Sequence, residues 1–546
     1  MPFAATEHPS LGLSLLKSAL TAAGIGSTVE YLNLSFAQLL GYGSYDSICK
    51  TRETDLIGEW VFAAELDSES QANDHTFTQR YLAPHGAAFA AEVRSARGLA
   101  ASFLETATAR ILAHSPSVVG FTSVFQQHVA SLALARMLKA RAPHLKILFG
   151  GANCEGVMGA TLVESFPWID AVVSGEADHI IVDLMQKLLA AESIDARPGV
   201  FTRSAPDVVQ AEGYAGEPPA MLAMDSLPYP DFADFFDQFA AHDVPAPWKP
   251  RLLFETARGC WWGAKQHCTF CGLNGTTMAF RSKSPERAIA ELECLVNTYG
   301  TKSIGAVDNI MDMRYLANFV PELARRNLEL DLLYEVKANL KKEQLRALKA
   351  AGIHTIQPGI ESLSTPVLAL MRKGVRALQN VQLLKWCQEL DIAVSWNMLW
   401  GFPGENPLEY PAMAKLVSKL VHLRPPDASG RIRLDRFSPN FDNAESIGLT
   451  RVDPHESYRC VYQLDDDATR GLAYYFTFEY ADARDVAAYT LPLSEALSVW
   501  NEVHKTSRLI AVDYGEALLI ADWRTNRTSS FAVLEGLERA LYLRCD

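Results

Sequence analysis

The sequence RGCWWGAKQHCTFCGLNG, residues 258–275, places three cysteines within twelve residues of a chain that has nine cysteines in 546 residues. Two residues separate Cys268 from Cys271, whereas seven residues lie between Cys260 and Cys268. A structural zinc site is almost always four-coordinate, so three cysteines would leave one ligand to be found elsewhere. Three thiolates also suit a cubane iron-sulfur cluster in which one iron stays open for an exogenous ligand.

A zinc ion completed by His267 or by a distant residue is the alternative interpretation of this stretch. His267 directly precedes Cys268, and this spacing disfavours binding of the same ion by both residues. The cysteines also follow a strand-like run, residues 252–259, and precede further strands rather than a small zinc-stapled module. The open-cluster interpretation is therefore favoured.

Six strand-like runs separated by helical segments follow residue 250. This alternation predicts a partial TIM-type (β/α)6 barrel over residues 250–440, with its chemistry at the carboxyl ends of the strands. The cysteine stretch follows the first run, where such a barrel has its active site. The runs are LLFETARG (252–259), SIGAVDN (303–309), LLYEVKA (332–338), TIQPGIES (355–362), AVSWNMLWG (393–401) and RIRLDRFSP (431–439).

A second alternation of strands and helices precedes the barrel and predicts a doubly wound Rossmann-like α/β domain over residues 1–215. Strands are expected at residues 117–125, 145–151 and 168–175, and another at residues 27–35, STVEYLNLS. Residues 49–114 interrupt the rhythm and are expected to form a helical insertion. A doubly wound sheet should begin with a strand before Pro9, so we expect that this strand is lost or that the natural protein begins further upstream.

Two further segments complete the predicted organisation. Residues 216–249 are rich in Pro and Asp at their start and are expected to be a linker. Residues 441–546 mix helix with a hairpin-like pattern and predict a small α+β module, which stops in mid-pattern and is expected to be incomplete.

Composition limits the class of protein. The chain is 49% hydrophobic and 21% charged with a net charge of -14, which is typical of a globular protein and disfavours a nucleic-acid surface. The odd number of scattered cysteines, the lack of a basic signal-peptide start and the lack of an apolar run near 20 residues predict a cytoplasmic protein outside the membrane. An acidic chain suits a small-molecule or peptide substrate.

The cysteine triad after the first strand of a six-unit barrel resembles the radical S-adenosylmethionine (SAM) superfamily. The common spacing in that superfamily is three residues and then two, and this chain departs from it. The longer first gap and its surrounding sequence are similar to the cobalamin-dependent radical SAM C-methyltransferases that mature ribosomally synthesised peptides. The resemblance implies that Cys260, Cys268 and Cys271 hold a [4Fe-4S] cluster whose open iron binds SAM.

The resemblance also implies SAM contacts at successive strand ends. Each has a plainer alternative, namely a core aromatic, an Asx-turn or an ordinary turn. We expect Trp261 and Trp262 to be structural. The implied residues are Phe270 near the adenine, Asp308 and Asn309 near the amino group, Glu335 and Lys337 with Lys337 at the carboxylate, Glu361 and Ser362 at the ribose, and Gly401 under the adenine.

The amino-terminal domain is similar to the cobalamin-binding domain of the same enzymes. It has no GxGxxG motif for a dinucleotide and no DxHxxG motif to supply a histidine to cobalt, so base-off, His-off cobalamin is implied. A generic flavodoxin-like domain with glycine turns is the alternative. The implied contacts are Pro9, Ser10, Leu11 and Gly12; Phe121, Thr122, Ser123 and Gln126; Gly150, Gly151 and Asn153; and Ser174, Gly175 and Glu176.

The resemblance implies methylation of an unactivated carbon in a precursor peptide, with an electron donor of the flavodoxin or ferredoxin type as partner. Residues 513–542 faintly resemble the small winged domains that hold leader peptides. Two alternatives remain open. One is a radical cross-link, epimerisation or rearrangement in which cobalamin transfers no methyl group, and the other is a non-catalytic cobalamin- or zinc-binding interaction protein.

Overall fold

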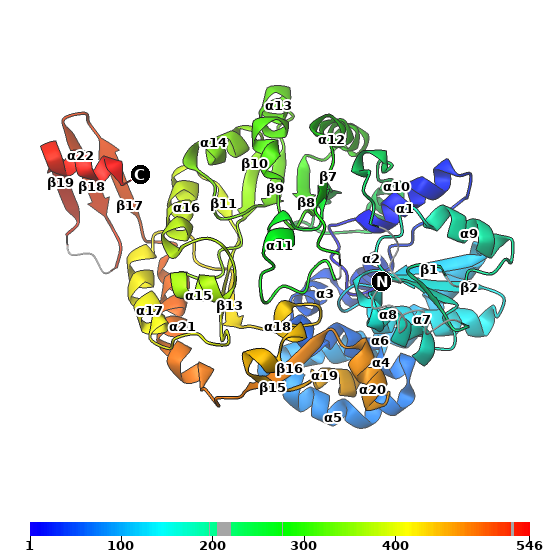
Figure 1. The fold of residues 1–546 in the computed structure, drawn as a ribbon. Helices are drawn as coiled ribbons and strands as arrows, with labels where there is room; N and C mark the ends of the chain where they lie inside the picture. The colour runs from blue at the N-terminus through cyan, green and yellow to red at the C-terminus, as the bar shows by residue number, and fades with distance from the viewer. Residues whose placement is uncertain (196, 205–219, 276, 526–528, 546) are drawn as a thin grey trace.

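The computed structural model describes residues 1–195, 197–204, 220–275, 277–525 and 529–545. Two α/β bodies lie side by side, and a small three-stranded sheet projects at the end of the barrel farthest from the amino-terminal body (Figure 1). The expected boundary near residue 215 lies outside the described residues. None of the described helices is long and apolar enough to span a bilayer.

The first sheet contains β1 (Val118–Thr122), β2 (Lys146–Gly150) and β3 (Ala171–Val173), which are parallel, and β4 (Val200–Thr202), which is antiparallel to β3. The described strands lie in the order β1-β2-β3-β4, without the reversal expected of a doubly wound sheet. The carboxyl ends of the three parallel strands therefore share one edge. The helices of this body are α7 (His128–Arg141), α8 (Val157–Ser165) and α9 (Ile181–Leu189).

The prediction of a strand at residues 27–35 is wrong, because the helix α2 (Leu32–Leu40) begins within this segment. Leu32, Phe36 and Ala37 are buried at a helical spacing, and this periodicity outweighs the β-branched start of the segment. The following residues form the helices α3 (Tyr42–Cys49), α4 (Ile57–Leu66) and α6 (Ala87–Ala113), and α4 and α6 both pack on α7.

The barrel sheet has the order β11-β10-β9-β8-β5, and all its strands are parallel. A bridge between Glu361 and Met398 connects β12 to this sheet, and β12 pairs in parallel with β13. The partial barrel expected from the sequence is confirmed. Its strands are β5 (Leu252–Phe254), β8 (Ser303–Ala306), β9 (Asp331–Glu335), β10 (Ile353–Gln357), β11 (Ala393–Val394), β12 (Asn397–Trp400) and β13 (Ala428–Arg431).

Helices cover the outer side of these strands in an arc (Figure 1). The helix α12 (Pro285–Tyr299) shows why they form where they do: Ser284 caps its first turn, Pro285 is its first residue and Gly300 ends it with a left-handed φ of 67°. The others are α13 (Phe319–Arg326), α14 (Lys342–Ala350), α15 (Thr365–Leu370), α16 (Ala377–Glu389) and α17 (Glu409–Leu420).

The segment expected to be a linker contains a packed helix. The helix α10 (Ala233–Ala241) carries Asp234, which accepts a hydrogen bond from the backbone nitrogen of Val29 at 2.7 Å and forms an ion pair with Lys17. Lys17 lies on α1 (Leu11–Ala22), whose Leu11 and Leu15 pack into the barrel core. The first helix of the chain therefore packs on the barrel and α10, and it also contacts α9 of the first body.

The carboxyl-terminal region contacts both bodies. An antiparallel sheet of β14 (Leu434–Asp435), β16 (Tyr475–Tyr480) and β15 (Leu449–Pro454) shares a core with the amino-terminal helices, and α20 (Asp466–Leu472) packs on α8. The helix α21 (Val486–Val503) packs along α17. The projecting sheet consists of β17 (Leu509–Asp513), β18 (Ala517–Asp522) and β19 (Phe531–Glu535), followed by α22 (Gly536–Arg544).

Candidate functional site

The cysteine loop leaves the barrel through a short hairpin. The strand β6 (Ala257–Arg258) pairs with β7 (Arg281–Ser282), and Gly259 follows with a left-handed φ of 74°. A Cβ atom on Gly259 would lie 2.2 Å from the backbone oxygen of Ala279, so only glycine allows this close approach. The loop thus returns on itself directly at the end of the first barrel strand.

The three cysteines lie on the two sides of this loop. Cys260 is the N-cap of α11 (Trp261–Lys265), and its Sγ accepts a hydrogen bond from the backbone nitrogen of Gly263 at 3.3 Å. Cys268 and Cys271 form one turn, in which the Cys271 nitrogen donates to the Cys268 oxygen at 3.2 Å. His267 lies with its Nε2 atom 2.9 Å from the Cys271 oxygen, so this ring nitrogen bonds to backbone.

Burial determines the protonation of these thiols. Burial raises the pKa of Cys268, and it raises the pKa of Cys271 to about 12. Both thiols are therefore protonated at neutral pH in the free protein, and a metal centre must displace their protons when it binds. In the described part of the chain, no three Cys, His, Asp or Glu side chains are grouped around one point as ligands of a single ion.

Two lysines lie beside the cysteine turn. The Nζ atom of Lys373 is 3.2 Å from Oε1 of Glu361 and 5.7 Å from the ring centroid of Phe270, which directly precedes Cys271. The Nζ atom of Lys337 lies 3.5 Å from the centroid of the Trp262 ring. Burial, with the nearby charge of Lys373, lowers the pKa of Lys337 to about 8. Lys337, Lys373 and Glu361 therefore place two cations and one carboxylate near any metal centre that the three thiols bind.

Two of the residues assigned to SAM from the sequence are fully occupied by other contacts. Asp308 is buried and accepts hydrogen bonds from the backbone nitrogen and hydroxyl of Thr256 and, at 3.0 Å, from the hydroxyl of Tyr334. Ser362 is also fully buried, and its Oγ accepts a bond from the nitrogen of Ser364 at 3.1 Å. These two side chains support the strand ends, and their contacts do not reach the cleft.

Glu335 and Gly401 have different surroundings. Burial, together with the nearby Asp308 and Glu361 carboxylates, raises the pKa of Glu335 to about 7.

The Gly401 nitrogen donates to both oxygens of the buried Glu405, and its carbonyl accepts a bond from the Tyr480 hydroxyl. Phe270 meets Phe402 edge to face, with ring centroids 5.9 Å apart. The Phe270–Phe402 pair and the hydrogen-bonded turn at Gly401 thus lie at the end of β12.

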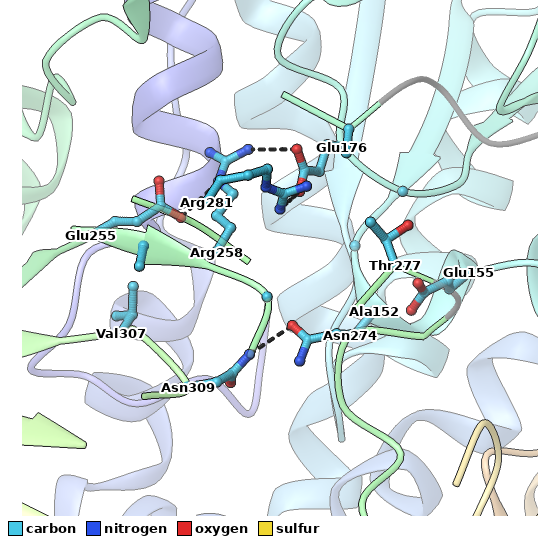
Figure 2. Close-up of a pocket in the computed structure, with 15 residues that line it drawn as sticks. Ala152, Glu155, Glu176, Glu255, Arg258, Asn274, Thr277, Arg281, Val307 and Asn309 are labelled. Carbon is cyan, nitrogen blue, oxygen red and sulfur yellow. Dashed lines mark hydrogen bonds and ion pairs between the residues drawn. The ribbon is translucent and has the colours of Figure 1, made fainter. Parts of the chain in front are cut away.

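A cleft of about 330 Å³ lies where the cysteine stretch meets the carboxyl edge of the first sheet (Figure 2). Its lining comes from both α/β bodies, so a ligand in it would contact both. The lining includes Gly151, Gly175, Glu176, Glu255, Asn274 and Arg281.

Charged groups span this cleft (Figure 2). Arg281 donates to Glu176 at 2.6 Å, and Arg258 pairs with Asp178 at 2.6 Å and with Glu255 at 2.8 Å. Arg281 and Glu255 are each 8% exposed, yet Nε and Nη1 of Arg281 and Oε2 of Glu255 make no hydrogen bond. Buried polar atoms are usually satisfied, so these donors and this acceptor suit a polar ligand in the cleft.

Three of the residues assigned to cobalamin from the sequence, Gly151, Gly175 and Glu176, line the cleft. Behind them, the Ser123 nitrogen donates to the Gly150 oxygen at 2.8 Å, the side-chain amide of Asn153 donates to Ser123, and Ser174 accepts a bond from Gly156. These bonds tie together the loops that follow β1, β2 and β3.

The remaining assigned residues lie elsewhere. Pro9, Ser10, Leu11 and Gly12 begin α1, which packs on the barrel, and they do not line the cleft. Phe121 is buried and stacks on Phe149 with centroids 4.9 Å apart. Gln126 accepts a bond from Gly58 at 2.8 Å within the helical region, and Thr122 ends β1 without lining the cleft.

Sequence reasoning did not single out Lys373, Arg281, Glu255 or Asn274. Asn274 accepts a bond at 2.7 Å from the side chain of Asn309, an assigned residue. Arg258 and Asn274 stand within the cysteine stretch itself, so their position was a usable signal. Lys373 is separated by about a hundred residues from the cysteines, and only the fold brings it there.

Comparison with known proteins shows what the central region is similar to. Residues 254–417 match the family profile described as the radical SAM superfamily. The chain is 26% identical over 340 residues to an uncharacterized methyltransferase of Pyrococcus horikoshii, covering 60% of this chain and 70% of the relative. It is 22% identical over 299 residues to the anaerobic magnesium-protoporphyrin IX monomethyl ester cyclase of Cereibacter sphaeroides, covering 53% of this chain and 47% of the cyclase.

Solved structures show the same fold. The cobalamin-dependent S-adenosylmethionine radical enzyme OxsB with aqua-cobalamin bound aligns with a TM-score of 0.54 and 15% identity, over 74% of this chain and 60% of OxsB. The radical S-adenosylmethionine methyltransferase TsrM from Kitasatospora setae aligns with a TM-score of 0.53 and 15% identity, over 80% of this chain and 85% of TsrM. The chain thus spans less than two thirds of the cyclase and of OxsB.

Proposed function

We propose that this chain, whose residues 254–417 are a radical SAM domain, is a cobalamin-dependent C-methyltransferase that acts on a ribosomally made peptide. Membership of that superfamily implies a [4Fe-4S] cluster and SAM. The observation that carries the rest of the proposal is the shared cleft, which is lined both by the strand ends of the first sheet and by the cysteine stretch.

The residues present fit these groups. Cys260, Cys268 and Cys271 supply three thiolates to the cluster once their protons are displaced. Arg281 and Glu255 offer unsatisfied donors and an acceptor to a polar ligand, as the amide-bearing rim of a corrin would require. When bound, the cluster with SAM supplies hydrogen abstraction from carbon, and cobalamin supplies the methyl group.

Cobalamin is favoured at the first sheet for two further reasons. The loops after β2 and β3 present Gly151 and Gly175 to the cleft, and glycine permits a flat macrocycle to approach the backbone closely. OxsB and TsrM, which share the fold, have been solved with cobalamin bound. The buried His128 is not placed to bind cobalt in this cleft, because it does not line the cleft and its Nδ1 contacts the Ser123 hydroxyl behind the cleft wall.

A peptide substrate is supported by the projecting sheet. Ile510, Val512, Phe531 and Val533 lie on one face of it at alternating positions and are all more than 40% exposed. The ion pair between Arg539 of α22 and Asp513 places that helix on the opposite face. An open apolar sheet face can accept an extended or helical peptide.

The test uses anaerobically reconstituted protein with reductant, SAM, methylcobalamin and the short peptide encoded beside its gene. A peptide gain of about 14 Da, the mass of one CH₂ unit, is the expected result, lost in Cys260→Ala, Cys268→Ala and Cys271→Ala. Deoxyadenosine with an unshifted peptide mass would instead indicate a cross-link, epimerisation or rearrangement. Absence of iron and of absorbance near about 400 nm would exclude the radical function.

A further inference from the structure

The spacer between the first two cysteines makes contacts in two directions. It contains α11, and the indole nitrogen of Trp261 donates to the Met311 oxygen at 3.0 Å, beyond the end of β8. The indole nitrogen of Trp262 donates to the Arg372 oxygen, also at 3.0 Å, in the turn that follows α15. The long spacer is therefore fastened on both sides of the cysteine loop.

The turn at residues 370–373 is held by the cysteine loop and by the end of β9. Its four consecutive backbone oxygens all accept hydrogen bonds from those two segments. In chain order, Leu370 accepts from the Thr269 hydroxyl at 3.4 Å, Met371 from the Thr269 nitrogen at 3.2 Å, Arg372 from Trp262 at 3.0 Å and Lys373 from Lys337 Nζ at 2.5 Å.

The shape of this turn depends on Trp262. Arg372 has a left-handed φ of 56°, which is uncommon for a residue other than glycine. Gly374 has a φ of 65°, and a Cβ atom there would lie 2.2 Å from the Trp262 ring. The indole thus packs directly against the backbone of residue 374 while it bonds residue 372, and it brackets Lys373 between the two.

The side chain of Lys373 is directed by this turn toward the cysteines. Its Nζ is ion-paired with Glu361 at 3.2 Å and lies 5.7 Å from the Phe270 ring centroid, and its side chain is 15% exposed. Phe270 stands between Cys268 and Cys271, so a fixed positive charge lies next to the position that these thiolates give to a cluster. Water screens a charge in such a place far less than it screens a surface charge.

We propose that α11 is a positioning strap, in which Trp262 holds the turn at residues 370–374 so that the Lys373 ammonium lies beside the cluster and favours its reduced state. The inference rests on the proposed function, since it requires a cluster at the three cysteines. Reduction adds one electron from an external one-electron donor, and no bond forms or breaks. The added negative charge is stabilised by a nearby cation, and cluster potentials respond to local charge and hydrogen bonding.

The test is an electron paramagnetic resonance redox titration of reconstituted protein without SAM, with iron and sulfide counted per chain. Lys373→Met should make the midpoint potential more negative by about 59 mV. For one electron this shift is a tenfold fall in the ratio of reduced to oxidised cluster at a fixed potential. Glu361→Gln removes the opposing charge and should move the midpoint in the positive direction. Lys373→Arg keeps the charge and should stay near the unmodified protein.

The strap itself is tested by a matched pair of indole variants. Trp262→Phe loses the bond to Arg372 and the outer indole atoms that pack against Gly374, and should shift the midpoint negatively by less than Lys373→Met. Trp261→Phe loses the bond on the other side of the loop and should leave the midpoint unchanged.

The outcomes separate this inference from the proposed function. Full iron and sulfide with unchanged midpoints in Lys373→Met and Glu361→Gln would overturn the electrostatic role while the cluster assignment stands. Equal shifts in both indole variants would overturn the specific role of Trp262. Failure of the unmodified protein to take up iron and sulfide would instead refute the proposed function, on which the inference depends.

Discussion

Gly151 shows how a single residue shapes the cleft. It follows β2 with a φ of 95°, and a Cβ atom there would lie 2.6 Å from the backbone oxygen of Ser123 and 2.9 Å from its nitrogen. Those backbone atoms also carry the hydrogen bonds that tie the loops after β1 and β2 together. The conformation and the close approach both require glycine.

Gly151→Ala should therefore destabilise the protein by about 1–3 kcal/mol, the usual cost of a forced left-handed residue, and should weaken cobalamin binding. Thermal denaturation and equilibrium dialysis against aquacobalamin measure the two effects. Gly120→Ala, in the neighbouring strand with nothing within 4 Å of the new methyl group, is the matched control. Equal behaviour of the two variants would contradict the role given to Gly151.

The sequence predicted which residues follow the strands better than it predicted where their side chains point. Gly151 and Gly175 were identified from glycine after a strand, and both line the cleft. Ser362 follows a strand equally well, but it faces inward and is fully buried. Sequence position gives the end of a strand and not the direction in which its side chain points.

At the scale of elements, the turn after β12 is held by a helix from the far end of the chain. Glu405 accepts bonds from the nitrogens of Gly401 and Phe402 and from the hydroxyls of Tyr410 and Tyr489. Tyr489 lies on α21, which packs along α17. The turn proposed to lie under the SAM adenine is thus fixed from outside the barrel.

Tyr489→Phe removes one hydroxyl from this buried carboxylate, and a bond to a charged group is worth about 1.5–3 kcal/mol. We expect several-fold weaker SAM binding with unchanged iron and sulfide, measured by isothermal titration calorimetry under anaerobic conditions. Tyr514→Phe, which removes a hydroxyl from a side chain that is 69% exposed, provides the control. Unaltered SAM affinity in Tyr489→Phe would show that the turn is rigid without it.

Glu59 connects two helices of the amino-terminal body. Its carboxyl group on α4 accepts hydrogen bonds from the backbone nitrogens of His128 and Val129, the first residues of α7, at 3.0 and 2.7 Å. Burial raises the pKa of Glu59 to about 7 from an ordinary value of about 4.5. Between those pH values the folded protein holds a proton that the unfolded chain releases.

The contribution of Glu59 to stability should therefore fall as pH rises from about 4.5 to about 7 and stay constant above that range. Its full size is on the order of 3 kcal/mol, because one pKa unit corresponds to about 1.4 kcal/mol. Chemical denaturation gives the free energy of unfolding of the unmodified protein and of Glu59→Gln at pH 5 and at pH 8. The contributions of other titrating groups cancel in the difference between the two proteins at each pH. An equal difference in unfolding free energy between the two proteins at both pH values would refute the raised pKa of Glu59.

Elements were predicted best where burial leaves a simple pattern. The first five barrel runs are apolar, and each contains a barrel strand in the structure. The sixth run, residues 431–439, was placed too late, because the barrel strand β13 ends at Arg431 and the run itself contains β14 of the antiparallel sheet. The segment at residues 27–35 contains β-branched and aromatic residues, yet its apolar positions repeat as on a helix. The packed helix α10 was not predicted, because the Pro- and Asp-rich sequence that precedes it led to the whole segment being interpreted as a linker.

At the scale of the molecule, ion pairs cross from one α/β body to the other. Arg258 and Arg281 come from the hairpin that starts the cysteine loop, and Glu176 and Asp178 follow β3 of the first sheet. The sequence could not predict these pairs, because nothing in a local pattern specifies which distant charges will meet. They fix the cysteine stretch relative to the edge of the first sheet.

Arg281→Leu should lower the affinity for cobalamin by about 10- to 100-fold, because it removes both the pair with Glu176 and the two unpaired donors of a residue that lines the cleft. Equilibrium dialysis measures this, with circular dichroism to verify the fold. Arg325→Leu, on the exposed surface of α13 where the arginine pairs with Glu322, serves as the control. Wild-type affinity in Arg281→Leu would place the ligand outside this cleft.

The packing of β15, β16 and α20 against the amino-terminal helices has a consequence for synthesis. Tyr458, Val461 and Tyr475 belong to the same core as Phe36, Phe62 and Phe149, although about 300 residues of chain, including the whole barrel, lie between Phe149 and Tyr458. A ribosome adds about 5–20 residues per second, so the amino-terminal body waits tens of seconds for its last apolar layer. During that interval a nascent chain carries an unfinished core, and the cell must shield it until the far end of the protein arrives.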